Sequence, residues 1–114
     1  MKVIIAGSRT FNNLELVEEI MKEFPGVTEV VCGCARGADE CGRQWADRHR
    51  ITVTPFPADW ENHGRAAGII RNMEMGAYAD FLVAFWDGKS KGTKHMIDYM
   101  KKIGKHGKVV MFNG

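Results

Sequence analysis

The stretch Val3-Ile4-Ile5-Ala6-Gly7-Ser8-Arg9 decides the fold class, because it joins a short β-type apolar run directly to a glycine loop. The same succession recurs at residues 33–39 (Gly-Cys-Ala-Arg-Gly-Ala-Asp) and at residues 88–93 (Gly-Lys-Ser-Lys-Gly-Thr), and each loop leads into a helix-type pattern. Glycine lets a backbone turn sharply and approach a ligand closely, and a helix that begins there aims unpaired N–H groups and partial positive charge at the ligand. The three loops therefore predict one shared anion site, most simply for a phosphate-bearing molecule.

Strand-type and helix-type patterns alternate along the chain. The strand-type runs are short and mostly β-branched or aromatic, as in strands that are buried on both faces of a parallel sheet. Right-handed helical crossovers between parallel strands predict an α/β fold, namely a single Rossmann-like, three-layer domain over residues 1–114 with a five-stranded parallel sheet and about four helices. The five predicted strands are residues 3–6, 29–32, 51–56, 80–85 and 108–112.

Apolar residues recur at helical spacing between these strands. Asn12 and Glu15 have the spacing of a capping box before the first helix, and Pro25-Gly26 ends its pattern. The predicted inward side chains are Leu14, Val17, Met21 and Phe24 in this helix; Ala38, Cys41, Trp45 and Ala46 in a second at about 37–49; Ala66, Ile70, Met73 and Ala77 in a third at about 65–78; and Met96, Met100 and Ile103 in a fourth that follows Thr93 and stops at Gly104.

All three glycine loops fall at the carboxyl ends of predicted strands. Ligands of doubly wound sheets bind beyond these ends, where the winding reverses direction. The reversal usually lies beside the first strand, so we expect residues 7–9 to face residues 88–93 across one crevice.

Composition limits the class of protein only modestly. A chain of 114 residues with 45% hydrophobic content is large enough to bury roughly two-thirds of its unfolded surface without disulfides or a metal. Sixteen basic and fourteen acidic side chains give a net charge of +2, so no global field attracts DNA or anionic lipid. No apolar run approaches the length of a membrane span, and we expect a cytoplasmic protein with no membrane partner and with Cys32, Cys34 and Cys41 reduced.

Two common phosphate-loop fingerprints are missing. No GxGxxG follows the first strand, and the pair Lys89-Ser90 lacks the spacing of a P-loop. The sequence therefore argues against an ordinary NAD dehydrogenase and against a P-loop ATPase. No His or Cys pair has zinc-type spacing, so we predict no metal site and no required cofactor, although Mg²⁺ is compatible with ligand phosphates.

Polar residues in the loops each have a structural and a functional interpretation. Arg9 and Arg36 can hold phosphate in two-pronged fashion or can be solvated surface arginines. Asp39 can balance the dipole of its helix, or can contact a ribose or take part in catalysis. Ser90 and Thr93 can cap the fourth helix and bind phosphate, because the two roles are compatible.

The segment after the third strand adds further candidates. Trp60 follows Asp59 at a strand end, where an aromatic ring can stack on a base, although core or lid contact is the commoner role. Arg71 and Asn72 flank the predicted apolar stripe, and a charged group that borders a core usually has a partner. The predicted ligand-binding residues are Gly7, Ser8, Arg9, Gly33, Ala35, Arg36, Gly37, Trp60, Asn72, Gly88, Ser90, Gly92 and Thr93.

Taken in order, these motifs resemble a known family over nearly the whole chain. Besides the three loops, the matching segments are Trp45-Ala46, Phe56-Pro57-Ala58-Asp59-Trp60, Ala66-Ala67-Gly68 with Arg71-Asn72, Asp80 and Trp86-Asp87-Gly88. The chain resembles the YspA (cpYpsA-related) family of the SLOG superfamily. This resemblance implies a Rossmann-type domain of a bacterium or phage, from a superfamily whose members bind nucleotides, ADP-ribose-like signals or, in DprA, single-stranded DNA.

The resemblance extends in part to the Lonely-guy enzymes, which hydrolyse nucleoside monophosphates to a free base and ribose phosphate. Gly92-Thr93 and Arg71 resemble their glycine-threonine and arginine, but Lys94-His95-Met96 stands where their acid is expected. Cleavage of an N-glycosidic bond needs a carboxylate. If this chain hydrolyses nucleotides, we predict Asp39 or Asp59 as the acid and Arg71 as the phosphate clamp.

Three functional classes follow. The leading hypothesis is a domain that binds a nucleotide or an ADP-ribose-type ligand, and senses or sequesters it. The second is a nucleoside 5′-monophosphate phosphoribohydrolase. The third is single-stranded DNA binding, suggested by seven lysines from Lys89 to Lys108 against the one acid Asp98, although a solvated helix face explains the same pattern. Pairing into a homodimer through the methionine-rich faces around Met73, Met96 and Met100 is an expectation that core burial would equally explain.

Overall fold

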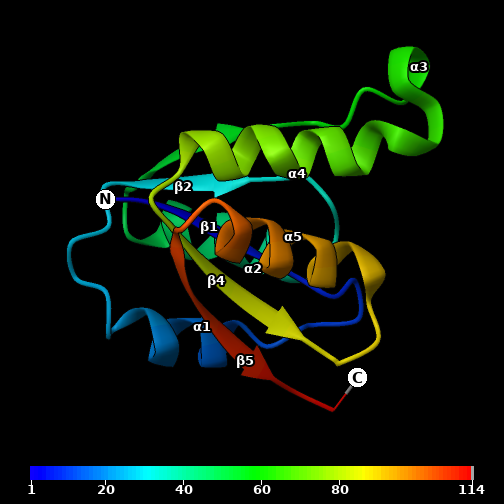
Figure 1. Cartoon of the computed structure of the whole chain (residues 1–114). Helices are drawn as coiled ribbons and strands as arrows, with labels where there is room; N and C mark the ends of the chain where they lie inside the picture. The colour runs from blue at the N-terminus through cyan, green and yellow to red at the C-terminus, as the bar shows by residue number, and fades with distance from the viewer. Residues whose placement is uncertain (114) are drawn as a thin grey trace.

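The computed structural model describes residues 1–113 and contains a five-stranded, all-parallel sheet in the order β3-β2-β1-β4-β5 (Figure 1). The predicted α/β fold with a five-stranded parallel sheet is therefore confirmed. The bounds of β2 are as predicted, and those of the other four strands differ from the prediction by one or two residues. The strands are β1 (Lys2–Gly7), β2 (Glu29–Cys32), β3 (Thr52–Pro55), β4 (Phe81–Trp86) and β5 (His106–Met111).

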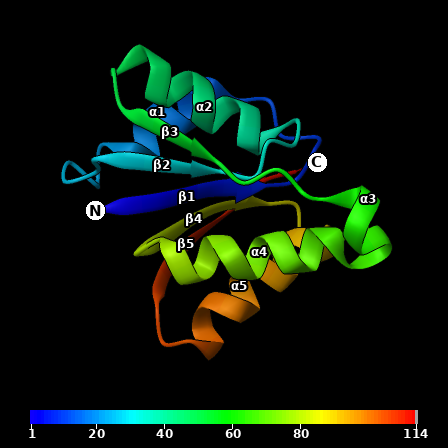
Figure 2. The same ribbon diagram turned by 90° about the horizontal axis from the view of Figure 1, so that it is seen from above.

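Helices cover both faces of the sheet and make the three layers of the predicted Rossmann-like arrangement. Figure 2 shows α1 and α2 on one face and α4 and α5 on the other, with α3 beyond the carboxyl ends of the strands. Four helices have eight residues or more, as predicted, and α3 is an additional single turn. The bounds are α1 (Leu14–Met21), α2 (Ala38–Arg48), α3 (Trp60–His63), a 3-10 turn (Gly64–Ala66), α4 (Ala67–Tyr78) and α5 (Lys91–Lys102).

The core lies on both faces of the central strands. In β1, Val3 and Ile5 pack in the cluster under α1 and α2, whereas Ile4 and Ala6 pack in the cluster under α4 and α5. Successive side chains of a strand point to opposite faces, so a continuous apolar run is what a strand with both faces covered requires. Burial of β1 and β4 thus fixes the central strands, whose carboxyl ends carry two of the three glycine loops.

The face that α4 turns inward differs from the prediction. Ala66, Met73 and Ala77 were expected in the core but are exposed, and Ile70 is only half-buried. Small and polar residues take the inward positions because α4 packs closely on α5, where a Cβ at Gly76 would lie 2.8 Å from the Tyr99 ring. The buried residues of α4 are Ala67, Asn72, Met75 and Gly76.

Two helix ends also differ from the prediction. Asn13, not Asn12, caps α1, because its side-chain oxygen accepts a hydrogen bond from the Leu16 N–H at 3.0 Å. The fourth predicted helix, α5, begins at Lys91, two residues before Thr93, and Ile103 lies outside it with 36% of its surface exposed. Among residues 1–113, no helix is long and apolar enough to cross a bilayer.

Candidate functional site

The winding of the sheet reverses at β1, which pairs with β2 on one side and β4 on the other. The loops after β1 and β4 meet there, as predicted. The Ser8 N–H donates to the Phe85 carbonyl at 3.0 Å, and the Asp87 N–H donates to the Ser8 hydroxyl at 3.2 Å. Ser8 is buried, so this hydrogen-bonded pair of loops forms a fixed floor at the switch point.

The loop between β4 and α5 organises itself through its own side chains. One carboxylate oxygen of Asp87 accepts hydrogen bonds from the Lys89 and Ser90 N–H groups, each at 2.9 Å, and these bonds hold the pKa of Asp87 below its ordinary value. Ser90 then caps α5, since its hydroxyl accepts from the Thr93 N–H at 3.4 Å and lies 3.0 Å from the Thr93 hydroxyl. The predicted capping role of Ser90 is confirmed, and its phosphate-binding role stays a prediction.

The loop between β2 and α2 depends on contact with the neighbouring loop. Gly37 caps α2 without a side-chain hydrogen bond, has a φ of 83°, and leaves no room for a Cβ, which would lie 2.5 Å from the Ser8 carbonyl oxygen. Glycine alone adopts such a backbone at little cost. The Ala38 N–H also donates to the Ser8 carbonyl, at 3.3 Å, so the loops after β1 and β2 are held as one unit.

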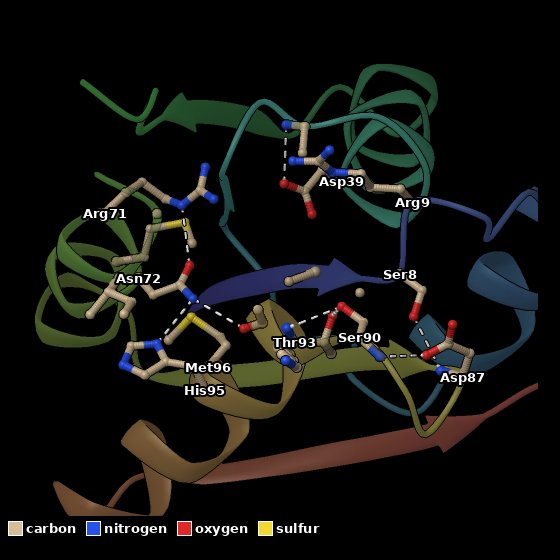
Figure 3. A pocket seen from close by; sticks show the side chains of 18 of the residues that line it. Ser8, Arg9, Asp39, Arg71, Asn72, Asp87, Ser90, Thr93, His95 and Met96 are labelled. Carbon is tan, nitrogen blue, oxygen red and sulfur yellow. Dashed lines mark hydrogen bonds between the residues drawn. The ribbon is translucent and has the colours of Figure 1, made fainter. Parts of the chain in front are cut away.

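Asp39 lies in the first turn of α2 and faces into the site (Figure 3). Only 6% of its surface is exposed, and burial raises the pKa of its carboxyl from 3.8 to about 6. A hydrogen bond from the Ala35 N–H at 3.2 Å and the positive charges of Arg71 and Arg9 partly offset that rise. The buried carboxylate therefore has acceptor capacity that no helix cap consumes.

Arg71 and Asn72 connect α4 to the β2–α2 loop and to the first turns of α5. Arg71 donates to the Gly33 carbonyl and, at 3.1 Å, to the Asn72 side-chain oxygen. The Asn72 amide nitrogen lies 3.2 Å from both the Gly92 carbonyl and the His95 Nδ1. Since an arginine can only donate, the Asn72 oxygen must face it, and the Asn72 NH₂ then donates to Nδ1, which places the proton of a neutral His95 on Nε2.

A cavity of about 580 Å³, here called the main lobe, opens between these loops and α4. Most of the predicted site residues line it, although lining alone does not test their roles. The predicted residues in its wall are Gly7, Ser8, Arg9, Ala35, Asp39, Trp60, Arg71, Asn72, Ser90, Gly92 and Thr93.

A second cavity of about 440 Å³, here called the side lobe, lies between the β2–α2 loop and the segment after β3. It contains two predicted residues that the main lobe lacks, Gly33 and Arg36. Four residues line both cavities, so the two lobes are neighbours: Arg9, Ala35, Trp60 and Arg71.

Three predicted residues line neither cavity. Asp59 caps α3, where its carboxylate accepts from the Asn62 N–H at 3.2 Å and from the Asn62 amide at 2.7 Å, which lowers its pKa. Gly37 packs against the backbone of Ser8 and Arg9, and Gly88 has a φ of 80°, which allows the turn in the β4–α5 loop. The structure thus separates the two predicted acids, with Asp39 inside the main lobe and Asp59 outside it.

Sequence reasoning missed several lining residues. Lys91 lies inside the predicted loop 88–93 and His95 lies two residues after it, both in the first turns of α5, and this position was the available signal for them. Arg65 precedes α4 in the same way. The apolar wall had no such signal, because it depends on which faces α4 and α5 present: Ile69, Met75 and Met96.

The described part of the chain, residues 1–113, contains no group of three or more His, Cys, Asp or Glu side chains placed to hold a metal ion. Cys32, Cys34 and Cys41 are unbridged.

The fold and the site define a class, a Rossmann-like α/β domain with a cavity of charged, polar and apolar side chains at its topological switch point. A family model described as "YspA, cpYpsA-related SLOG family" matches residues 1–63, more than half of the chain, and the protein belongs to this family. The gene 61 protein of Mycobacterium phage D29 is 40% identical to the chain, in an alignment that covers 90% of each protein. No solved structure matches the chain. Membership of a SLOG family indicates binding of a nucleotide-related ligand only in general terms.

Proposed function

We propose that the main lobe binds a nucleotide-type phosphorylated ligand, and that the protein senses or sequesters this ligand. The observation that carries the proposal is the wall of the main lobe, which combines Arg9 and Arg71 with the N-terminal turn of α5. The partial positive charge of a helix N-terminus and two guanidinium groups together favour a phosphate between them.

The parts of such a ligand fit different walls. Phosphate oxygens suit the α5 end, where Ser90 and Thr93 supply hydroxyls and Lys91 supplies charge. A base suits the apolar wall formed by Met75 and Met96. Both of these walls contain buried side chains, which packing holds in place. The site is therefore largely formed before a ligand binds, and this lowers the entropic cost of binding.

Ligand-observed NMR and calorimetry test the proposal with AMP, GMP, CMP, UMP, ADP-ribose and NAD, each with and without Mg²⁺. We expect selective binding of at least one ligand, and at least tenfold weaker binding to the variants Lys91→Ala and Thr93→Val, because each removes a proposed phosphate contact. Arg50→Ala is the charge-matched control, since Arg50 lies beyond the far end of α2. A wild-type protein that binds none of these ligands contradicts the proposal.

A second candidate function is hydrolysis of the N-glycosidic bond of a nucleotide, and the position of Asp39 favours it. Hydrolysis breaks the bond between C1′ and the base nitrogen, and water supplies a hydroxyl to C1′ and a proton to the base. A carboxylate can stabilise the positive charge that develops on the sugar. Asp39 is the buried acid of the main lobe, and Arg71 lies close to it beside Gly33, where it can hold the ribose phosphate.

A proton NMR time course separates binding from hydrolysis. If the candidate is correct, free-base signals grow with wild type and are at least 100-fold slower with Asp39→Asn, while the affinity for the monophosphate changes little. Asp59→Asn is the matched control, because Asp59 lies outside both lobes. Equal turnover in wild type and Asp39→Asn would exclude Asp39 as the acid.

Self-association also stays a proposal. Met96 and Met100 are buried in the core, so they cannot form a subunit interface, whereas Met73 on the outer face of α4 is partly exposed. A homodimer would therefore use the outer face of α4, and analytical ultracentrifugation of wild type against Met73→Glu tests this. A monomeric wild type contradicts it.

A further inference from the structure

We propose that the side lobe is a second anion subsite, and that the ligand is a dinucleotide whose halves occupy the two lobes. This inference rests on the proposed binding of a nucleotide in the main lobe. It starts from the size of the side lobe, about 440 Å³, which lies within the range of roughly 300–1,000 Å³ that is typical of small-molecule sites. A phosphate group alone needs much less space, so the side lobe has room for a second nucleotide half.

The charge of the side lobe selects an anion. Three arginines line it, Arg9, Arg36 and Arg71, and its lining includes no acidic residue. Within residues 1–113, neither Arg9 nor Arg36 forms an ion pair. The main lobe, in contrast, includes Asp39 and Asp87 in its wall. The side lobe is therefore the more positive of the two, and guanidinium groups favour phosphate there.

The backbone of the β2–α2 loop is shaped around the side lobe. Cys34 has a φ of 63°, a conformation that non-glycine residues rarely adopt, and its N–H donates to the Cys32 sulfur at 3.2 Å. Two residues on, Arg36 is exposed and lines the side lobe. Backbone strain in a loop that forms a cavity wall is common at ligand sites.

The boundary between the lobes suits the bridge of a dinucleotide. Arg9 and Arg71 line both lobes and come from opposite sides of the site, one from the β1 loop and one from α4. A linking phosphate between them would contact two cations at once. Trp60 also lines both lobes and has 57% of its surface exposed, so its ring is available to stack on a base at this boundary.

The test compares ligands with one and two phosphate-bearing halves. Calorimetry at constant ionic strength would measure AMP, adenosine 3′,5′-bisphosphate and the dinucleotide pApA on wild type, Arg36→Ala and Lys91→Ala. Arg36 lines only the side lobe and Lys91 only the main lobe. We expect wild type to bind pApA at least tenfold more tightly than AMP. Arg36→Ala should bind pApA at least fivefold more weakly and AMP within twofold of wild type, whereas Lys91→Ala should weaken both.

Each alternative outcome has a distinct meaning. Equal affinities of wild type for AMP and pApA, or an Arg36→Ala effect that is the same for both, would overturn the second subsite and leave the proposed function intact. Binding of adenosine 3′,5′-bisphosphate as tight as that of pApA, with the same dependence on Arg36, would overturn the dinucleotide, because a lone phosphate would then fill the side lobe. Absence of binding by all three probes would overturn the dinucleotide proposal, and it would contradict the proposed function as well if GMP, CMP, UMP, ADP-ribose and NAD also fail to bind. Arg50→Ala again controls for net charge.

Discussion

The N-termini of α5 and α2 lie at the same edge of the sheet but are built differently. At α5, Ser90 caps the helix and Asp87 accepts hydrogen bonds from the loop, so the end is stabilised by residues that are close in sequence. At α2, Gly37 caps the helix without a side-chain bond, and the loop is held by its contact with Ser8 of the neighbouring loop. The cap of α5 is thus local, although Ser8 and Asn72 also contact this end, whereas α2 has no side-chain cap and its N-terminus packs directly on Ser8 of the neighbouring loop.

The carboxyl groups at these two helix ends, Asp87 before α5 and Asp39 in α2, also differ in their environment. Hydrogen bonds from the Ser90 and Lys89 N–H groups lower the pKa of Asp87, whereas burial raises the pKa of Asp39 to about 6. Environments that move two carboxyl pKa values apart are common where one group shapes a site and the other acts in it. The comparison indicates that Asp87 mainly supports its loop, and that Asp39 is the group kept available in the main lobe.

The largest effect that the comparison predicts is at Gly37. An alanine there would have to adopt a φ of 83° and would place its Cβ 2.5 Å from the Ser8 carbonyl oxygen, so Gly37→Ala should lower the free energy of unfolding by about 2–4 kcal/mol. Urea denaturation measures this change. Gly92→Ala in the first turn of α5 is the matched control, because a Cβ there meets nothing within 4 Å and should change stability by no more than about 0.5–1 kcal/mol. Equal losses at both glycines would contradict the claim that close packing on the neighbouring loop makes glycine necessary at position 37 and not at position 92.

The second prediction concerns Asp39. Its native carboxyl keeps a proton up to a pH of about 6, whereas the unfolded carboxyl loses it near 3.8, so the native state binds more protons in this interval. The stability that Asp39 contributes should therefore fall as the pH rises from about 4 to 6. Asp39→Asn keeps an acceptor for the Ala35 N–H and removes the charge, and should stabilise the protein at pH 7 by about 1–3 kcal/mol.

Urea unfolding of wild type and Asp39→Asn at several pH values between 4 and 8 tests this prediction. The difference in stability between the two proteins should grow as the pH rises through the interval and stay constant above about 7. Asp87→Asn should show little change between pH 4 and 8, because the pKa of Asp87 is lowered from 3.8 and its contribution to stability is lost only as the pH falls below about 4. If Asp39→Asn is less stable than wild type at pH 7, the buried carboxylate has partners that offset its burial.

The contrast between local contacts and contacts distant in sequence also explains which parts of the molecule the sequence predicts. Local signals were sufficient for the five strands and for the Ser90 cap, because apolar runs and a serine at a helix start act within a few residues. The switch point was expected from the general winding of such sheets, since local pattern does not give the strand order. The inward face of α4 was mispredicted because its pattern of exposed Met73 and buried Asn72 reverses the usual rule. The buried Asn72 side chain is satisfied by hydrogen bonds with the Gly92 carbonyl on α5 and with Arg71. No local sequence pattern shows such partners.

In the candidate site, too, some features were predictable from local sequence and others depend on packing. Its loops were predictable, since glycine after a strand marks a turn wherever it occurs. The positions of the two candidate acids were not, because Asp39 and Asp59 both follow strand ends in the sequence, and only the packing of α2 against the β1 loop brings Asp39 into the main lobe. Arg36 lines the side lobe in a loop whose Cys34 has a left-handed backbone, a conformation that sequence rarely predicts for cysteine.

The smallest predicted effect is at Ser90 and separates capping from ligand binding at the α5 end. Ser90→Ala removes the cap and should cost about 1 kcal/mol of unfolding free energy, whereas Ser90→Asp keeps an acceptor for the Thr93 N–H and should retain wild-type stability within about 0.5 kcal/mol. An aspartate also places negative charge where we propose a phosphate, so Ser90→Asp should bind the ligand much more weakly than Ser90→Ala. Thermal denaturation and calorimetry on the two variants measure both quantities. A Ser90→Asp variant that binds the anionic ligand as tightly as wild type would place the phosphate away from α5, and the α2 end with its arginines would then be the main anion site.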